Sequence, residues 1–133
     1  MSDHQAIDAR EARAIVWARQ GSLCARCWQP MHSWSWEAHH RQRRRESVAG
    51  WCPCNVVGLH PRCHTQGITR QATGLWAVHD EPELARAHGL IVPSWAPNPA
   101  DVPTTIGWPW QGSAYLDHEG MVVSGLEKAA PTR

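Results

Sequence analysis

The hydrophobic and polar positions near the start of the chain repeat with a helical period. Residues 5–19 combine strong helix formers with apolar positions on one side, which predicts an N-terminal helix. Gly21 is expected to end this helix, and Ser2 to cap its start. The apolar positions of the predicted helix are Ile7, Ala14, Ile15 and Ala18.

Two strands are predicted after the helix. Residues 32–40 alternate in the manner of a strand, with Trp34, Trp36, Ala38 and His40 on one side and Glu37 and His39 among those on the other. Residues 55–60, "NVVGLH", form a second short apolar run. "PRCHTQG" then indicates a turn or the start of a helix, since proline is tolerated at a first helical position.

The second half of the chain predicts less regular structure. Residues 81–88 indicate a brief helix that ends at Gly89, and residues 90–95 resemble a strand. Residues 96–111 are rich in proline and are expected to be an extended arm across a surface. A hairpin is expected to turn at residues 117–120. We therefore predict a domain over residues 1–95 and a C-terminal extension over residues 96–133.

The composition fits one small domain of 133 residues with little room for a layered core. Nine tryptophans, with one tyrosine and no phenylalanine, are expected to supply much of its packing. A net charge of +1 argues against a generic polyanion binder, although arginines gather at residues 41–45. The sequence shows neither a run of 18 apolar residues nor a secretory signal, so we expect a cytoplasmic protein without membrane contact.

The cysteines indicate a metal site. Their number is five, and an odd number without a secretory signal argues against a disulfide framework. Cys24 and Cys27 form a Cys-x-x-Cys pair, and His60 and Cys63 share the same spacing, which together predict a Cys3His structural zinc site. Two alternatives stay open for the Cys-x-Cys pair: one of Cys52 and Cys54 replaces His60 as a zinc ligand, or both are buried small apolar residues.

Histidines outside that set suggest a second, open metal site. His39, His40 and His64 are not needed for the zinc, and His64 directly follows a candidate zinc ligand. An open metal site beside a neutral imidazole can activate water for phosphodiester hydrolysis.

Three ordered motifs, "CARC", "EAHHR" and "NVVGLHPRCH", resemble an HNH endonuclease with a zinc-binding frame, of the compact kind found in phages and actinobacteria. The resemblance spans about residues 10 to 92 and implies an α+β fold with a zinc-stapled ββα-metal (His-Me finger) core. It also implies structural Zn²⁺, a catalytic divalent cation (Mg²⁺, Mn²⁺ or a transition ion) and DNA as the substrate.

The resemblance assigns roles to four residues of the two strands and the following helix. His40 would be the general base that activates water, and His39 and His64 would be ligands of the catalytic metal. Asn55 would orient the loop between the strands or contact the metal. Many family members carry a further histidine where this chain has Ile68, so we interpret residues 65–75 as an insertion and His79 as the displaced third ligand.

The assignments of His39 and His40 raise a geometric question. Neighbouring residues on an ideal strand point to opposite sides, so His39 and His40 can serve one phosphate only if the strand ends or distorts there. The arginines that follow are expected to contact DNA phosphates without reading sequence. These residues are Arg41, Arg43, Arg44 and Arg45.

The competing hypothesis is a non-catalytic zinc module that binds nucleic acid, which keeps the cysteines and arginines but needs neither His40 nor His64. A protein-interaction domain with a Trp-rich surface is the second alternative. The endonuclease hypothesis places the protein in the cytoplasm of a bacterial host cell. A second copy of the chain or a phage protein remains open as a partner.

Overall fold

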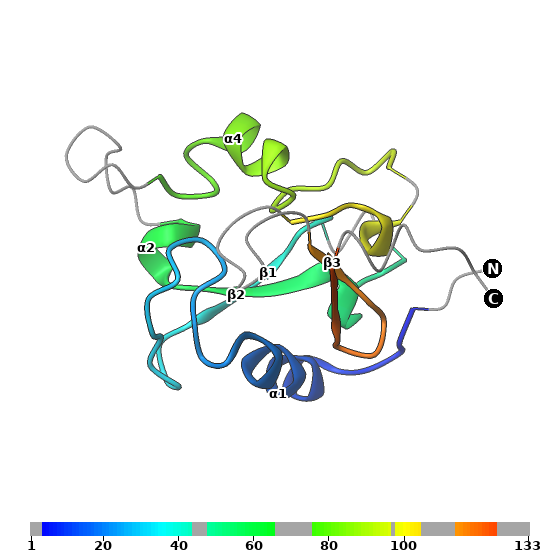
Figure 1. Cartoon of the computed structure of the whole chain (residues 1–133), viewed down its shortest axis with the longest axis horizontal. Helices are drawn as coiled ribbons and strands as arrows, with labels where there is room; N and C mark the ends of the chain where they lie inside the picture. Colours follow the sequence, from blue (N-terminus) through cyan, green and yellow to red (C-terminus); the bar gives the residue numbers. More distant parts are fainter. Residues whose placement is uncertain (1–3, 44–47, 66–75, 97, 105–113, 125–133) are drawn as a thin grey trace.

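The computed structural model describes residues 4–43, 48–65, 76–96, 98–104 and 114–124. Helices and two small sheets form a mixed α+β architecture (Figure 1), in agreement with the predicted class. Strand β1 pairs antiparallel with β2, and β3 pairs antiparallel with β4. The elements of the first 95 residues are α1 (Ala9–Gln20), β1 (Glu37–His40), the 3-10 helix η2 (Pro53–Asn55), β2 (Val56–Leu59), α2 (Pro61–His64) and α4 (Pro82–Ala87).

Helix α1 is the predicted N-terminal helix with a later start and a different buried face. Asp8 rather than Ser2 caps it, by accepting a hydrogen bond of 2.8 Å from the Glu11 N–H, and Gly21 ends it with a φ of 59°. The buried residues are Ala12, Val16 and Gln20, whereas the predicted apolar positions Ala14 and Ala18 are exposed.

The buried face of α1 differs from the predicted one because hydrogen bonds of Gln20 attach the helix to β2. The Gln20 amide donates to the Gly58 carbonyl at 3.0 Å and accepts from the Gly58 N–H at 2.7 Å. The same amide also donates to the Leu23 carbonyl at 2.7 Å. A count of apolar positions along the helix cannot anticipate a buried glutamine that is satisfied by hydrogen bonds outside the helix.

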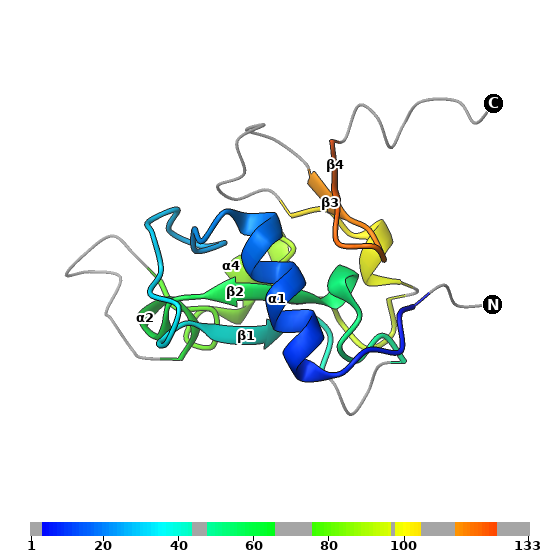
Figure 2. The ribbon, with the colours of Figure 1, turned by 90° about the horizontal axis from the view of Figure 1, so that it is seen from below.

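The β1–β2 ribbon is the centre of the molecule. All four residues of β2 are buried, because α1 lies on one side of the ribbon and α4 on the other (Figures 1 and 2). This two-sided cover explains the uninterrupted apolar run of the second predicted strand. The first predicted strand is shorter than its alternating pattern, since β1 begins only at Glu37 and Trp34 is 81% exposed.

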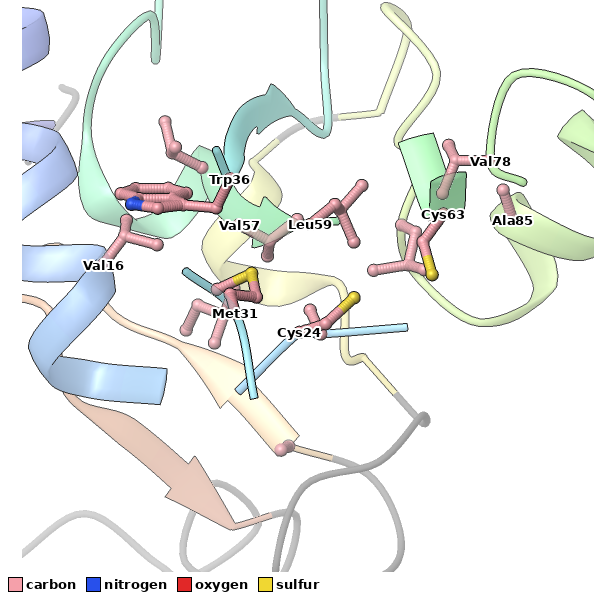
Figure 3. Packing of buried hydrophobic residues seen from close by; sticks show 14 of the residues in the cluster. Val16, Cys24, Met31, Trp36, Val57, Leu59, Cys63, Val78 and Ala85 are labelled. Carbon is pink, nitrogen blue, oxygen red and sulfur yellow. The ribbon is translucent and has the colours of Figure 1, made fainter. Parts of the chain in front are cut away.

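Apolar side chains from α1, β2, α2 and α4, and from the segments between them, pack into one core (Figure 3). Trp36 and Trp76 are buried in it, and Trp17, Trp28 and Trp51 pack against it. Trp95 is 82% exposed. Trp108 and Trp110 lie outside the described residues. The described tryptophans therefore serve mainly as packing residues, as the composition suggested.

The described part of the C-terminal extension packs against the rest of the fold, and residues 105–111 of the expected arm lie outside the described residues. It contains η3 (Pro99–Asp101), β3 (Ala114–Leu116) and β4 (Val122–Ser124), and residues 117–121 form the turn of the hairpin. Ala114 and Leu116 join the core that contains Val16 and Leu59. The strand expected at residues 90–95 is absent from this described segment.

None of the helices within the described ranges is both long enough and apolar enough to cross a membrane.

Candidate metal centres

Cysteine and histidine side chains gather into three groups in the described part of the chain. Within each group the potential ligand atoms lie within 4.8 Å of one another, a spacing that can hold a metal ion such as zinc. The groups are Cys24, Cys27, His60 and Cys63; His39, His64 and His79; and His4, Cys52, Cys54 and His118.

The first group joins the turn after α1 to the start of α2. Cys27 Sγ lies 3.2 Å from His60 Nδ1, and His60 Nε2 donates to the Pro30 carbonyl at 2.9 Å, which leaves Nδ1 as the ligand atom. Backbone N–H groups of Arg26 and His60 each donate to Cys24 Sγ at 3.4 Å. The four residues predicted from the spacing of the two pairs thus lie together, and Cys52 and Cys54 are not among them.

The three thiols of this first group shift one another's pKa. Hydrogen bonding with Cys24 and then with Cys63 lowers the pKa of Cys27. Contacts with Cys24 and Cys27 raise the pKa of Cys63. The lowered pKa of Cys27 favours its thiolate, and a bound cation would displace the remaining thiol protons, because thiolate is the form that binds metal.

The second group lies where β1, α2 and the segment before α4 meet. His39 is on β1 and 5% exposed, whereas His64 ends α2. The His79 N–H donates to the His64 carbonyl at 3.0 Å, so the backbone itself sets these two imidazoles side by side, with ring centroids 4.6 Å apart. The structure thus brings together the three histidines that the sequence proposed for a catalytic metal; Ile68 lies outside the described residues.

Hydrogen bonds fix which nitrogens of the second group point at each other. His39 Nε2 donates to the Leu90 carbonyl at 2.6 Å, and burial lowers the pKa of His39 to about 3, so this ring is neutral with its lone pair on Nδ1. His64 Nδ1 lies 2.9 Å from Glu37 Oε1 and donates to it.

His39 Nδ1 and His64 Nε2 lie 3.1 Å apart. When Nδ1 of His64 carries the proton that Glu37 accepts, two lone pairs face each other across this distance. They need a cation between them, either a proton or a metal ion. A tetrahedral ion with bonds of about 2.0 Å to nitrogen would hold its nitrogen ligands roughly 3.3 Å apart. Burial, followed by repulsion from His64, also lowers the pKa of His79 and favours its neutral, ligating form.

An open pocket of about 1000 Å³ includes this histidine group in its lining. The cationic or titratable residues of the lining are histidines and arginines, and none of the described lining residues is an Asp or Glu. A pocket of this composition favours an anion near the histidines. Arg86 of α4 is part of it, a residue that the sequence motifs did not indicate.

His40 also lines the pocket although it follows His39 directly on the strand. Strand β1 ends at His40, which answers the question of how adjacent residues can face one site. The His40 ring packs edge-on against Trp51, with centroids 4.3 Å apart.

Asn55 holds the loop that follows β1. It is fully buried, and its side chain accepts from the Gln42 N–H at 2.8 Å and donates to the carbonyls of Gln42 and Gly50. Of the two roles expected for Asn55, the structure shows loop orientation, since these contacts are with the backbone beside the site.

The two described arginines of the cluster, Arg41 and Arg43, differ in their exposure to solvent. Arg41 was expected to contact DNA, but it is 1% exposed and donates to the carbonyls of Cys54, Gly89, Pro99 and Val102. Its guanidinium is therefore not available to a phosphate, and its burial lowers its pKa to about 10. Arg43 is exposed and lines the pocket. Arg44 and Arg45 lie outside the described residues.

The third group surrounds the Cys-x-Cys pair. His4 and His118 stand beside Cys54 and Cys52, respectively, at 3.3 and 3.4 Å. Neither histidine is indicated by a local motif, because His118 lies 66 positions from Cys52 and His4 lies 50 positions from Cys54. The sequence feature that could have indicated this group is the Cys-x-Cys pair, which the predicted Cys3His site does not use.

Comparisons of the chain with protein-family models, with curated proteins and with solved structures found no match.

Proposed function

We propose that this protein is a metal-dependent HNH endonuclease that hydrolyses DNA phosphodiester bonds. One observation carries the proposal: the histidine group His39, His64 and His79 lies in a pocket lined by imidazoles and guanidiniums. Three protein ligands leave coordination positions open for water and substrate, which is the arrangement of a catalytic rather than a structural metal. The order of motifs along the chain supports the family assignment.

Each residue of the pocket has a distinct part in this proposal. His39, His64 and His79 would hold the cation, with Glu37 fixing the His64 ring from behind. The bound cation would supply charge stabilisation for the phosphate and for the leaving oxygen. His40 would accept a proton from the attacking water. The packing of its ring against Trp51 restricts the orientation of the imidazole.

Arg43 and Arg86 would position the DNA backbone beside the histidines. Their guanidiniums can bind phosphate oxygens without distinguishing bases, so we expect weak sequence preference. Structural zinc at Cys24, Cys27, His60 and Cys63 would hold the turn after α1 against α2, and thereby fix the helix that carries His64.

A nicking assay on supercoiled plasmid with added Mg²⁺ or Mn²⁺ tests the proposal. We expect the wild-type protein to nick or linearise the plasmid, and His40→Ala to lose at least about 100-fold in rate while it still binds DNA. His32→Ala is the matched control, because His32 is exposed and lies outside all three groups. Binding without cleavage by wild type and His40→Ala alike would instead establish the non-catalytic zinc module.

A further inference from the structure

Two buried thiols just before β2 take no part in the proposed nuclease chemistry. We propose that the third group is a second, closed zinc site, which fastens both ends of the described chain to the turn that leads into β2. Its ligands are His4, Cys52, Cys54 and His118. This zinc site is independent of the nuclease proposal, because it shares no residue with the histidine pocket.

The geometry of the ligand atoms fits one ion. Cys54 Sγ lies 3.3 Å from His4 Nδ1, and Cys52 Sγ lies 3.4 Å from His118 Nδ1. The two imidazoles meet edge to face, with centroids 4.8 Å apart and planes at 77°. Tetrahedral zinc with nitrogen and sulfur ligands separates them by roughly 3.3–3.8 Å. A shared ion therefore requires only small adjustments of these side chains.

The turn that carries the thiols is held by contacts that do not involve sulfur. Arg19 donates to the Pro53 carbonyl at 2.7 Å, and Arg41 donates to the Cys54 carbonyl at 2.8 Å. The Asn55 N–H donates to the Cys52 carbonyl at 2.8 Å. The backbone conformation that brings the two sulfurs together is thus established independently of a metal, which lowers the ordering cost of binding one.

The group has the character of a structural site. Cys52 and Cys54 are fully buried, and His4 and His118 are half-buried beside them. Four protein ligands occupy every position of a tetrahedral ion, so none remains for substrate, unlike in the three-histidine pocket. Two thiolates with two imidazoles select zinc over Mg²⁺ or Ca²⁺, which prefer oxygen ligands.

The positions of the ligands indicate what such an ion would do. His4 precedes α1, and His118 lies in the turn of the β3–β4 hairpin, which Figure 2 shows beside η2 and the N-terminal segment. An ion shared by these segments would close two long loops, and closing long loops restricts the unfolded chain most. The small core of this domain makes such a cross-link valuable for stability.

Native mass spectrometry of the full-length protein, purified in the presence of zinc, counts the bound ions. We expect the double variant Cys52→Ser/Cys54→Ser to hold one zinc fewer than the wild type, because both proteins keep the other two groups. Equal zinc counts in the two folded proteins would overturn the proposal. A disulfide between Cys52 and Cys54 in the freshly purified wild type would overturn it as well.

His118→Ala tests the same site without altering the buried turn, in case the double variant does not fold. In competition with a chelator, we expect one zinc of His118→Ala to be at least about 10-fold weaker than in the wild type. His32→Ala is the control, since His32 stacks on Trp34 away from the group and should leave every zinc affinity unchanged. Wild-type zinc affinities in His118→Ala would contradict the site.

Discussion

Glu37 Oε1 accepts a hydrogen bond of 2.9 Å from His64 Nδ1, so the first strand orients an imidazole on the helix that follows the second strand. A carboxylate behind a ligating histidine fixes the tautomer of the ring and raises its basicity. We expect Glu37→Ala to weaken binding of the pocket metal by about 10–100-fold. Titration of the zinc-loaded protein with Mn²⁺, followed by calorimetry, measures the change.

Glu83→Ala is the control for Glu37→Ala, because Glu83 is an exposed carboxylate on α4 outside the pocket lining. It should leave the Mn²⁺ affinity at the wild-type value. Equal affinities in Glu37→Ala and Glu83→Ala would show that Glu37 does not orient a metal ligand.

Arg41 donates hydrogen bonds to four carbonyls in three separate segments, and its removal should destabilise the fold. Arg41→Ala would leave several buried acceptors without donors, at a cost of at least about 3 kcal/mol in the free energy of unfolding. Arg43→Ala, at an exposed position, should change that free energy by no more than about 0.5 kcal/mol. Urea denaturation compares the two variants. Similar stabilities would contradict the assignment of Arg41 as a structural residue.

Under the proposed function, we expect Arg43 to contribute to DNA binding rather than to stability. Arg43→Ala should weaken DNA binding at low salt and reduce the slope of log affinity against log salt concentration by about 1. Fluorescence anisotropy with a labelled duplex at several salt concentrations measures this slope. Arg10→Ala is the control, since Arg10 lies on α1, across the ribbon from α4. An unchanged slope in Arg43→Ala would remove Arg43 from the DNA contact surface.

Local signals in the sequence predicted the elements that carry the candidate site. The helix end at Gly21, the paired strands and the start of α2 at Pro61 follow from turn chemistry and apolar patterning. The Cys-x-x-Cys and His-x-x-Cys spacings likewise predicted which four ligands of the first group lie together, because each pair lies within a single turn.

The features that the sequence did not reveal depend on contacts between distant segments. In the sequence, Arg41 belongs to a run of arginines expected to contact DNA, and its burial depends on carbonyls of Cys54, Gly89, Pro99 and Val102, which lie 13 to 61 positions further along the chain. His4 and His118 carry no local signal, because the Cys-x-Cys pair that completes their group lies far along the chain. The burial of Gln20 likewise depends on a distant segment, since two of its hydrogen bonds are made with Gly58 of β2.

Gly120 provides a test of how the C-terminal hairpin docks on α1. Its φ is 89°, a conformation that residues with a side chain rarely adopt, and a Cβ there would lie 2.3 Å from Ile15 Cγ2. We expect Gly120→Ala to lower the free energy of unfolding by about 1–3 kcal/mol through backbone strain and this overlap together.

A second substitution separates the two causes. Ile15→Ala removes the overlapping methyl group, so in the Gly120→Ala/Ile15→Ala protein the loss should be smaller than the sum of the two single losses. The strain from the positive φ would remain in the double variant. Urea denaturation gives the free energies, and hydrogen exchange at residues 114–124 reports whether the hairpin loosens. Additive losses would mean that Gly120 and Ile15 are not in contact, and that the hairpin turn rests on α1 in some other way.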